Sequence, residues 1–209
     1  MLCAAVTAVT LLAAPGCTRV VTGNAVRGAG APGAKSSQCK RVSAPLTKIR
    51  SHAAGEPRLR IPQPPGWRRA AMLDSAIIRF TMGNKALAAN NFIPTAVVTL
   101  ESVPGGNTDY TTIFDQERSA LIDRLGATGL ETVETTLCGD TAEMVSYDAP
   151  AMGRIPPRKI KTLMVANAFN ANTYVATVTV QSTEPDNRAY ARDTETILTG
   201  FQMLPPKAG

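Results

Sequence analysis

The sequence has a single histidine, His52, among its 209 residues, and aromatic residues make up only 5% of it. One imidazole cannot build a His-rich metal site or a zinc-protease motif, because both use several histidines. A serine hydrolase needs a nucleophile, a base and an orienting acid, yet no GxSxG elbow occurs and His52 lies in a polar segment. We therefore predict no catalytic residue, no metal site and no cofactor, and a hydrolase is the most distant alternative.

Two further patterns are weak evidence for chemistry. Residues 28–33 read GAGAPG and satisfy GxGxxG, but a dinucleotide site needs a strand before the motif and a helix after it, and Pro32 interrupts this one. The carboxylate pairs Glu131/Glu134 and Asp140/Glu143 could perform acid–base chemistry. Each pair belongs to a strand segment with a polar face, so we expect both pairs to be exposed to solvent.

The first sixteen residues, MLCAAVTAVTLLAAPG, contain no charged side chain. The apolar run from Leu2 to Ala14 has the length of a signal-peptide core and is too short for a transmembrane helix. Small residues then precede Cys17, as in a bacterial lipobox, in which the cysteine becomes a lipidated N-terminus. We predict a signal peptide with a lipobox over residues 1–16 and lipid (palmitate) attachment at Cys17. The alternative is a buried apolar helix with a core cysteine.

Residues 17–38 are rich in Gly, Ala, Ser and Pro and carry spaced positive charges. A flexible chain of about 21 residues has a root-mean-square reach of roughly 25 Å, so we predict a tether that holds a folded domain just off a membrane leaflet. The tether's charges could lie along anionic headgroups or simply keep the linker soluble. The net charge of +6 favours contact with anionic surfaces but identifies no partner.

Export would assign a role to each of the four cysteines. Cleavage removes Cys3 and acylation consumes Cys17, which leaves Cys39 and Cys138 in an oxidising compartment where a disulfide persists. A bridge between them would close a loop of about 99 residues and stabilise the domain by about 4–5 kcal/mol on the loop-entropy model. We predict this disulfide; two unrelated buried thiols are the alternative.

Alternating and helical patterns predict one folded domain over residues 39–206, followed by a short tail, 207–209. Residues 45–60 are polar and predict a short helix or an irregular lead-in. Strands are expected at 58–62, 76–82, 96–103, 130–138, 142–147, 159–168 and 173–182, and helices after 107–109 and after 183–186. Most connections between neighbouring strands are short, which favours an antiparallel sheet with helices packed on it.

Several motifs occur together and in order along the chain. They are the lipobox and tether, a cysteine before a Pro-Leu segment, the turn IPQPPGW at 61–67, the segment TLCGDTA at 136–142, and a closing helix with Tyr190. This set resembles the LpqN/LpqT-type lipoproteins of mycobacteria over about residues 39–206. The matching positions are Pro62, Pro64, Gly66 and Trp67 in the entry turn and Cys138, Gly139 and Ala142 in the middle strand pair.

The resemblance implies a PsbP-like fold of the α+β class, a single-domain α-β-α sandwich around an antiparallel sheet. It also implies a role in the mycobacterial envelope, with links to mycolate-glycolipid transport and cell-wall assembly, and it supplies no catalytic residues. We expect an exported lipoprotein, anchored by lipid to the outer face of the cell membrane, that binds lipid or glycolipid and is not an enzyme. An adaptor that docks envelope transporters or mycolyl enzymes is the alternative. Nucleic acid is not an expected partner, because the exported chain lacks aromatics among its basic patches.

Two basic segments supply the candidate ligand contacts. One is Trp67-Arg68-Arg69, and the other holds Arg154, Arg158, Lys159 and Lys161. An anionic lipid or glycolipid headgroup fits such residues, although a solvated face without a partner is the simpler interpretation of either segment alone. A tryptophan at a turn is usually a core plug over a sheet edge.

Overall fold

The computed structural model describes residues 38–106 and 109–207, so the predicted signal peptide, Cys17 and the tether up to residue 37 lie outside the described residues. The strands and α-helices follow in the order β1 (Leu46–Ile49), β2 (Arg58–Pro62), β3 (Arg68–Arg69), β4 (Ile78–Gly83), β5 (Thr95–Pro104), α1 (Tyr110–Leu125), β6 (Thr128–Leu137), β7 (Asp140–Ala149), β8 (Arg158–Phe169), β9 (Asn172–Ser182), α2 (Arg188–Gly200) and β10 (Gln202–Leu204).

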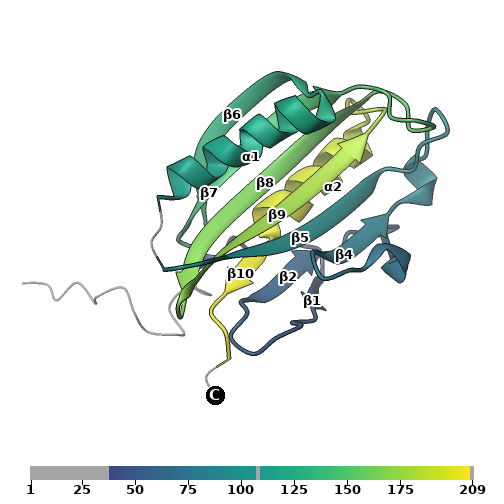
Figure 1. Cartoon of the computed structure of the whole chain (residues 1–209). Coiled ribbons are helices and arrows are strands. Elements are labelled where there is room, and N and C mark those ends of the chain that lie inside the picture. Colours follow the sequence, from purple (N-terminus) through teal and green to yellow (C-terminus); the bar gives the residue numbers. More distant parts are fainter. Residues whose placement is uncertain (1–37, 107–108, 208–209) are drawn as a thin grey trace, which may run out of the picture.

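Two antiparallel sheets form the framework. The larger sheet has seven strands in the order β3-β4-β5-β9-β8-β7-β6, and the smaller has three in the order β1-β2-β10. Helix α1 covers one face of the large sheet, and α2 lies with the small sheet against the opposite face (Figure 1). The predicted α+β class, the antiparallel pairing and the α-β-α layering are therefore confirmed.

The small sheet is the part of the architecture that was not expected. The lead-in predicted as a short helix or irregular segment contains strand β1, which pairs antiparallel with β2 so that Ile49 lies opposite Leu59. Strand β10 pairs with the other side of β2. Four residues are too few for a convincing alternation pattern, and β1 exists because a neighbouring strand supplies its hydrogen bonds and buries Ile49.

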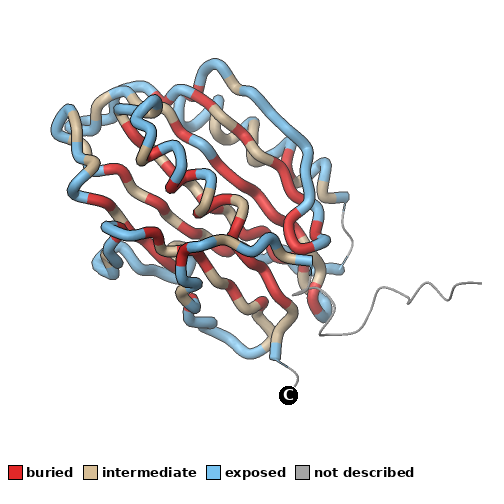
Figure 2. The backbone as a smooth tube through the Cα atoms, turned by 180° about the vertical axis from the view of Figure 1, so that it is seen from behind, coloured by how far each residue is buried: buried red, intermediate tan, exposed pale blue. Residues whose placement is uncertain are grey.

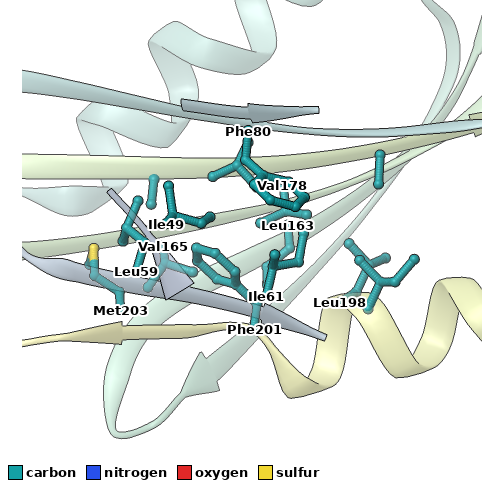
Figure 3. Close-up of a cluster of buried hydrophobic side chains, with 14 of the residues drawn as sticks. Ile49, Leu59, Ile61, Phe80, Leu163, Val165, Val178, Leu198, Phe201 and Met203 are labelled. Atoms are coloured by element: carbon teal, nitrogen blue, oxygen red, sulfur yellow. The ribbon is translucent and has the colours of Figure 1, made fainter. Parts of the chain in front are cut away.

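The core is divided between the two faces of the large sheet. Between the large sheet and the α2 layer lie side chains from both sheets, including Ile61, Phe80 and Val178, together with Phe201 at the end of α2 (Figure 3). Beneath α1 lies a smaller cluster around Phe114. Buried backbone runs along the central strands in Figure 2, while strand β6 at one edge is exposed over most of its length. Among the described residues, both clusters are built from side chains between Cys39 and Met203.

Both helices begin at capping side chains. Asp109 accepts a hydrogen bond from the backbone N–H of Thr112 at the start of α1, and Asn187 accepts bonds from two backbone N–H groups of α2. Such caps satisfy donors that the first helical turn leaves unpaired. Helix α1 ends at Gly126, whose φ of 64° is the left-handed conformation that glycine adopts easily. The predicted helices are confirmed, with α2 beginning slightly later than expected.

The Cys39–Cys138 disulfide is present, as the sequence predicted. Cys138 and Gly139 form the two-residue turn between β6 and β7, both with positive φ (53° and 85°). This is the backbone of a type I′ hairpin turn. The strand expected at 130–138 therefore ends one residue earlier, at Leu137. The turn holds Cys138 where the beginning of the folded domain can reach it.

One pair of carboxylates is not where it was expected. Glu131 and Glu134 are exposed on edge strand β6, as predicted, but Asp140 and Glu143 are only 3% and 4% exposed. Asn167 of β8 donates a hydrogen bond to Asp140 (2.5 Å), and Arg118 of α1 forms an ion pair with Glu143. The prediction of solvent exposure was wrong because these partners come from other elements, which a strand pattern does not reveal.

The two ends of the large sheet are distinct. At one end lie the turn Cys138–Gly139, the turn Asn170–Ala171 and the end of β5 at Pro104; we call this the cystine end. At the other, which we call the far end, lie β3 and the loop between β7 and β8. Because the strands are antiparallel, each residue between these turns can be placed by its register alone.

Candidate functional site

The sequence-predicted Trp67 lies in the core. It is 1% exposed, and its indole N–H donates a hydrogen bond to the carboxylate of Asp193 on α2 (3.0 Å). Buried indole groups usually have such a partner. The interpretation of Trp67 as a core plug is therefore confirmed, and its ring faces no open cavity.

The neighbouring arginines, Arg68 and Arg69, are exposed and lie at the far end. Arg69 forms an ion pair with Asp74, and its guanidinium lies 4.4 Å from the centre of the Phe80 ring. Arg68 lies on β3 opposite Gly83, a position without a side chain. Arg69 is therefore occupied by internal contacts, and Arg68 is the arginine of this pair that faces solvent.

The other predicted segment is divided between two faces of the large sheet. Arg158 donates a hydrogen bond to Gln181 (2.5 Å) and lies 5.9 Å from the Phe92 ring, and burial lowers the pKa of its guanidinium. Lys159 points to the opposite face and lies 3.9 Å from Asp148, while Arg154 is exposed on the loop. Successive side chains of a strand alternate between faces, so the structure does not bring these residues into one site.

A cleft of about 700 Å³ lies instead beside the hairpin of β1 and β2. Its lining consists of two strand segments, the loop between them and the end of the described chain: Lys48, Ile49, Arg50, Ser51, Ala53, Ala54, Gly55, Glu56, Arg58, Leu59, Arg60 and Lys207. Five of these side chains are cationic and one is acidic. We call it the cationic cleft.

Strand alternation explains the composition of the cationic cleft. Ile49 and Leu59 face the core (Figure 3). Lys48 and Arg60 are direct cross-strand partners on the opposite, outward face. Arg58, two residues before Arg60, lies on the same face. The hairpin therefore presents its cationic side chains outward, while the nearly buried side chains of Ile49 and Leu59 point to the opposite face and border the cleft at the strand ends.

The C-terminal segment closes one side of the cleft. The guanidinium Nε of Arg58 donates a hydrogen bond to the backbone carbonyl of Pro205 (2.8 Å). Strand β10, which precedes this segment, pairs with β2 so that Leu204 lies opposite Arg58. These contacts place Lys207 beside the cleft, although Lys207 is far from the other lining residues in the sequence.

Glu56 is the acidic residue of the lining, and it is already neutralised by Arg79. Two hydrogen bonds of 2.7 and 3.0 Å join the Arg79 guanidinium to the Glu56 carboxylate, which also accepts the backbone N–H of His52. Burial acts to raise the pKa of Glu56, but the Arg79 hydrogen bond and the backbone N–H groups of His52 and Ala53 outweigh it, so the pKa lies below its ordinary value. The cleft therefore keeps a cationic surface.

The cationic cleft lies at the cystine end. Gly55, in the loop between β1 and β2, approaches Asn170 so closely that a Cβ on Gly55 would lie 3.2 Å from its amide nitrogen. Arg79, which holds Glu56, is near the start of β4, which pairs with the middle of β5. Figure 1 shows the β1–β2 hairpin, the C-terminus and the tip of the β8–β9 hairpin at the lower end of the molecule.

The cationic cleft offers a concave surface lined by convergent charges. Among the described residues no group of His, Cys, Asp and Glu side chains has the arrangement of a metal site. The described helices include none that is both long and apolar enough to cross a membrane. A concave surface with a few convergent polar or charged groups is typical of ligand pockets. The sequence signal was the alternation Lys48-x-Arg50 and Arg58-x-Arg60, which has meaning only once β1 is recognised as a strand.

The comparisons with known proteins identify the family. A model of the family described as "Probable lipoprotein LpqN" matches residues 40–204. LpqN of Mycobacterium tuberculosis, whose crystal structure is described as that of a protein involved in cell envelope biogenesis, is 17% identical with a TM-score of 0.61, over 78% of this chain and 93% of LpqN. Cyanobacterial PsbP from Synechocystis is 13% identical with a TM-score of 0.50, over 79% and 96%.

A search of curated protein sequences finds no match. The structural similarities, at these identities, establish the PsbP-like fold but no ligand. The family model covers most of the chain, including both sheets and both helices. On that match, together with the sandwich and its disulfide, the chain belongs to the LpqN lipoprotein family.

Proposed function

We propose that this protein is an exported lipoprotein of the mycobacterial cell envelope, anchored through Cys17 to the outer face of the cell membrane. In this proposal it binds lipid or glycolipid without catalysing a reaction and supports lipid transport or wall assembly. The cationic cleft is the observation that carries the proposal, because five cationic side chains line it. The envelope role described for LpqN of Mycobacterium tuberculosis agrees with it.

Native mass spectrometry of residues 39–209, purified from a mycobacterial host, tests lipid binding. An added mass of lipid or glycolipid size, lost under denaturing conditions, is the expected result. A clean apo mass, with no rise in melting temperature on adding host lipids, would contradict it. Replacing Cys17 by Ala tests the anchor separately, since the variant should leave the membrane fraction and lose metabolic palmitate labelling.

An adaptor function is the second candidate, and edge strand β6 is the observation that favours it. This strand is ten residues long, pairs with β7 on one side, and exposes 61% of Val133. Exposed strand edges can pair with a strand from another protein. A photo-crosslinking residue at Val133 should then capture one envelope protein reproducibly in cells, whereas the same residue at Arg188 should not. Capture of only abundant neighbours at both positions would contradict the adaptor.

A further inference from the structure

The tether leaves the folded domain at the cystine end. Cys39 is bonded to Cys138 in the β6–β7 turn, so Cys39 is held at that end. Twenty-one residues separate Cys39 from Cys17 in the sequence. With Cys17 in a leaflet, the domain is attached to the membrane through its cystine end.

The cationic cleft lies at this same end. Its loop contacts Asn170 through Gly55, and the turn containing Asn170 is adjacent to the turn containing Cys138, because β7 and β8 are paired neighbours. The Asn167–Asp140 hydrogen bond joins these two hairpins beside their turns. Cys39, near the start of the described chain, and the cleft are therefore at one end of the molecule.

The positions of the charges in the cleft favour a bound anion. Lys48 and Arg60 are Cα partners across the β1–β2 pair, and both point outward. Like charges directly opposite each other destabilise a strand pair, and Arg58 on the same face adds a third. An anion between these side chains removes the repulsion and accepts hydrogen bonds from them. The acidic residue of the lining, Glu56, is bound to Arg79 and does not fill this role.

The far end also carries exposed cations, among them Arg68, Arg154 and Lys85, and it shares its surface with the exposed acids Glu184 and Asp186. Arg158 and Lys159 near that end lie on opposite faces of the large sheet, whereas the cationic side chains of the cleft line one cavity. A leaflet rich in anionic lipid attracts a basic surface held within a Debye length of it.

We propose that the cationic cleft is a phosphate-headgroup site that faces the membrane, through which the domain takes hold of anionic phospholipid in the leaflet to which it is tethered. The lipid phosphate lies among Lys48, Arg50, Arg60 and Lys207. This inference rests on the lipid-binding function proposed above and names the chemical class of its ligand.

Vesicle sedimentation tests the inference with the chain from residue 17 carrying Cys17→Ser, so that no acyl anchor contributes. The chain should bind phosphatidylcholine vesicles with about 30% phosphatidylglycerol and bind pure phosphatidylcholine weakly, with affinity that falls as salt is added. The variant Lys48→Gln/Arg50→Gln/Lys207→Gln removes three exposed charges of the cleft. Its partition coefficient should fall about 100-fold, roughly five-fold for each charge.

A matched control carries Lys85→Gln, Arg124→Gln and Arg188→Gln, which remove three exposed charges away from the cleft. Both triple variants have the same net charge, so any effect of total charge is equal. The control should lose no more than a few-fold in vesicle binding. Equal losses of vesicle binding in the two variants would overturn the proposal. So would binding by the parent chain that is the same with and without phosphatidylglycerol. Thermal melting of both variants checks that the fold is retained.

Competition with inorganic phosphate separates a lipid headgroup from a free anion. At equal ionic strength, phosphate should release the chain from vesicles little more than chloride does, because the anionic membrane surface as a whole also attracts the basic domain. Complete release by millimolar phosphate, but not by chloride, would identify a soluble-phosphate site and overturn the membrane-facing assignment. If native mass spectrometry finds bound lipid while the cleft variant keeps full vesicle binding, the inference fails and the proposed function stands. If neither assay finds lipid, both fail.

Discussion

Replacing Glu56 by Gln tests whether the Glu56–Arg79 pair holds the cleft loop in place. The side chains of Arg79 and Glu56 are only 7% and 10% exposed, and two hydrogen bonds join them. Removing the carboxylate charge leaves a buried guanidinium without a counter-ion, and breaking a buried pair in this way costs about 3–5 kcal/mol. We expect Glu56→Gln to lose about 3 kcal/mol, since the amide oxygen can still accept one bond.

Urea unfolding followed by circular dichroism measures the free energy of unfolding directly. A loss of about 3 kcal/mol corresponds to roughly 6–12 °C in melting temperature for a domain of this size. The double variant Glu56→Gln/Arg79→Met should be more stable than Glu56→Gln alone, because it removes the unpaired charge that causes the loss. Loss of the pair should also disturb the cleft loop, so the variants should bind anionic vesicles less well. This fall is expected even though Glu56→Gln removes a negative charge from the cleft.

The pH dependence of the free energy of unfolding is a second test of the Glu56–Arg79 pair. The pKa of Glu56 in the folded protein is below its ordinary value, so the unfolded chain binds a proton at higher pH than the folded one does. The stabilisation is then fully present above the ordinary glutamate pKa and is lost as the pH falls through the lowered, folded value. The stability difference between wild type and Glu56→Gln should shrink over that acidic range. A Glu56→Gln loss below about 1 kcal/mol, as for an exposed pair, or losses that simply add with Arg79→Met, would refute the reasoning.

Three further predictions concern the disulfide, the core tryptophan and the sequence-predicted basic residues. Reduction, or Cys39→Ser with Cys138→Ser, opens a loop of 99 residues and should lower the melting temperature by about 10 °C or more, since the loop-entropy stabilisation is about 4–5 kcal/mol; an unchanged melting temperature would contradict it. Trp67→Phe removes the hydrogen bond to Asp193 and leaves a buried carboxylate with one donor fewer, so urea unfolding should show a loss of about 2 kcal/mol, and the loss should be much smaller in an Asp193→Asn background. Arg68→Gln with Arg154→Gln should change vesicle binding by only a few-fold, because both lie at the far end; a loss equal to that of the cleft variant would return the ligand site to these residues.

The elements that were predicted correctly are those whose signal is local. Strand β9 alternates Thr and Val over enough residues to identify it, and Asp109 and Asn170 mark a helix start and a hairpin turn by their own chemistry. The Cys39–Cys138 bridge followed from counting the cysteines that export leaves available. None of these inferences needed to know which distant segments come together.

The features that were missed depend on distant segments. Strand β1 has four residues and is held by pairing with β2, which is held in turn by β10 from the end of the chain. The burial of Glu143 depends on Arg118 of α1, and that of Arg79 depends on Glu56. A polar residue in a strand pattern is assigned to solvent unless its partner is known, so sequence alone predicts these positions as exposed.

The basic residues show in two ways that position in the sequence does not predict position on the surface. Arg158 and Lys159 are adjacent in the sequence, yet strand alternation places them on opposite faces of the large sheet, where they contact Gln181 and Asp148. Lys48 and Arg60 are twelve positions apart, yet antiparallel register makes them direct neighbours. In a β-rich domain, clustering of charge along the sequence therefore says little about charge on the surface, because pairing register decides which charges meet. A basic segment becomes evidence for an anion site only when its strand partners are known, and in this protein they favour the β1–β2 hairpin.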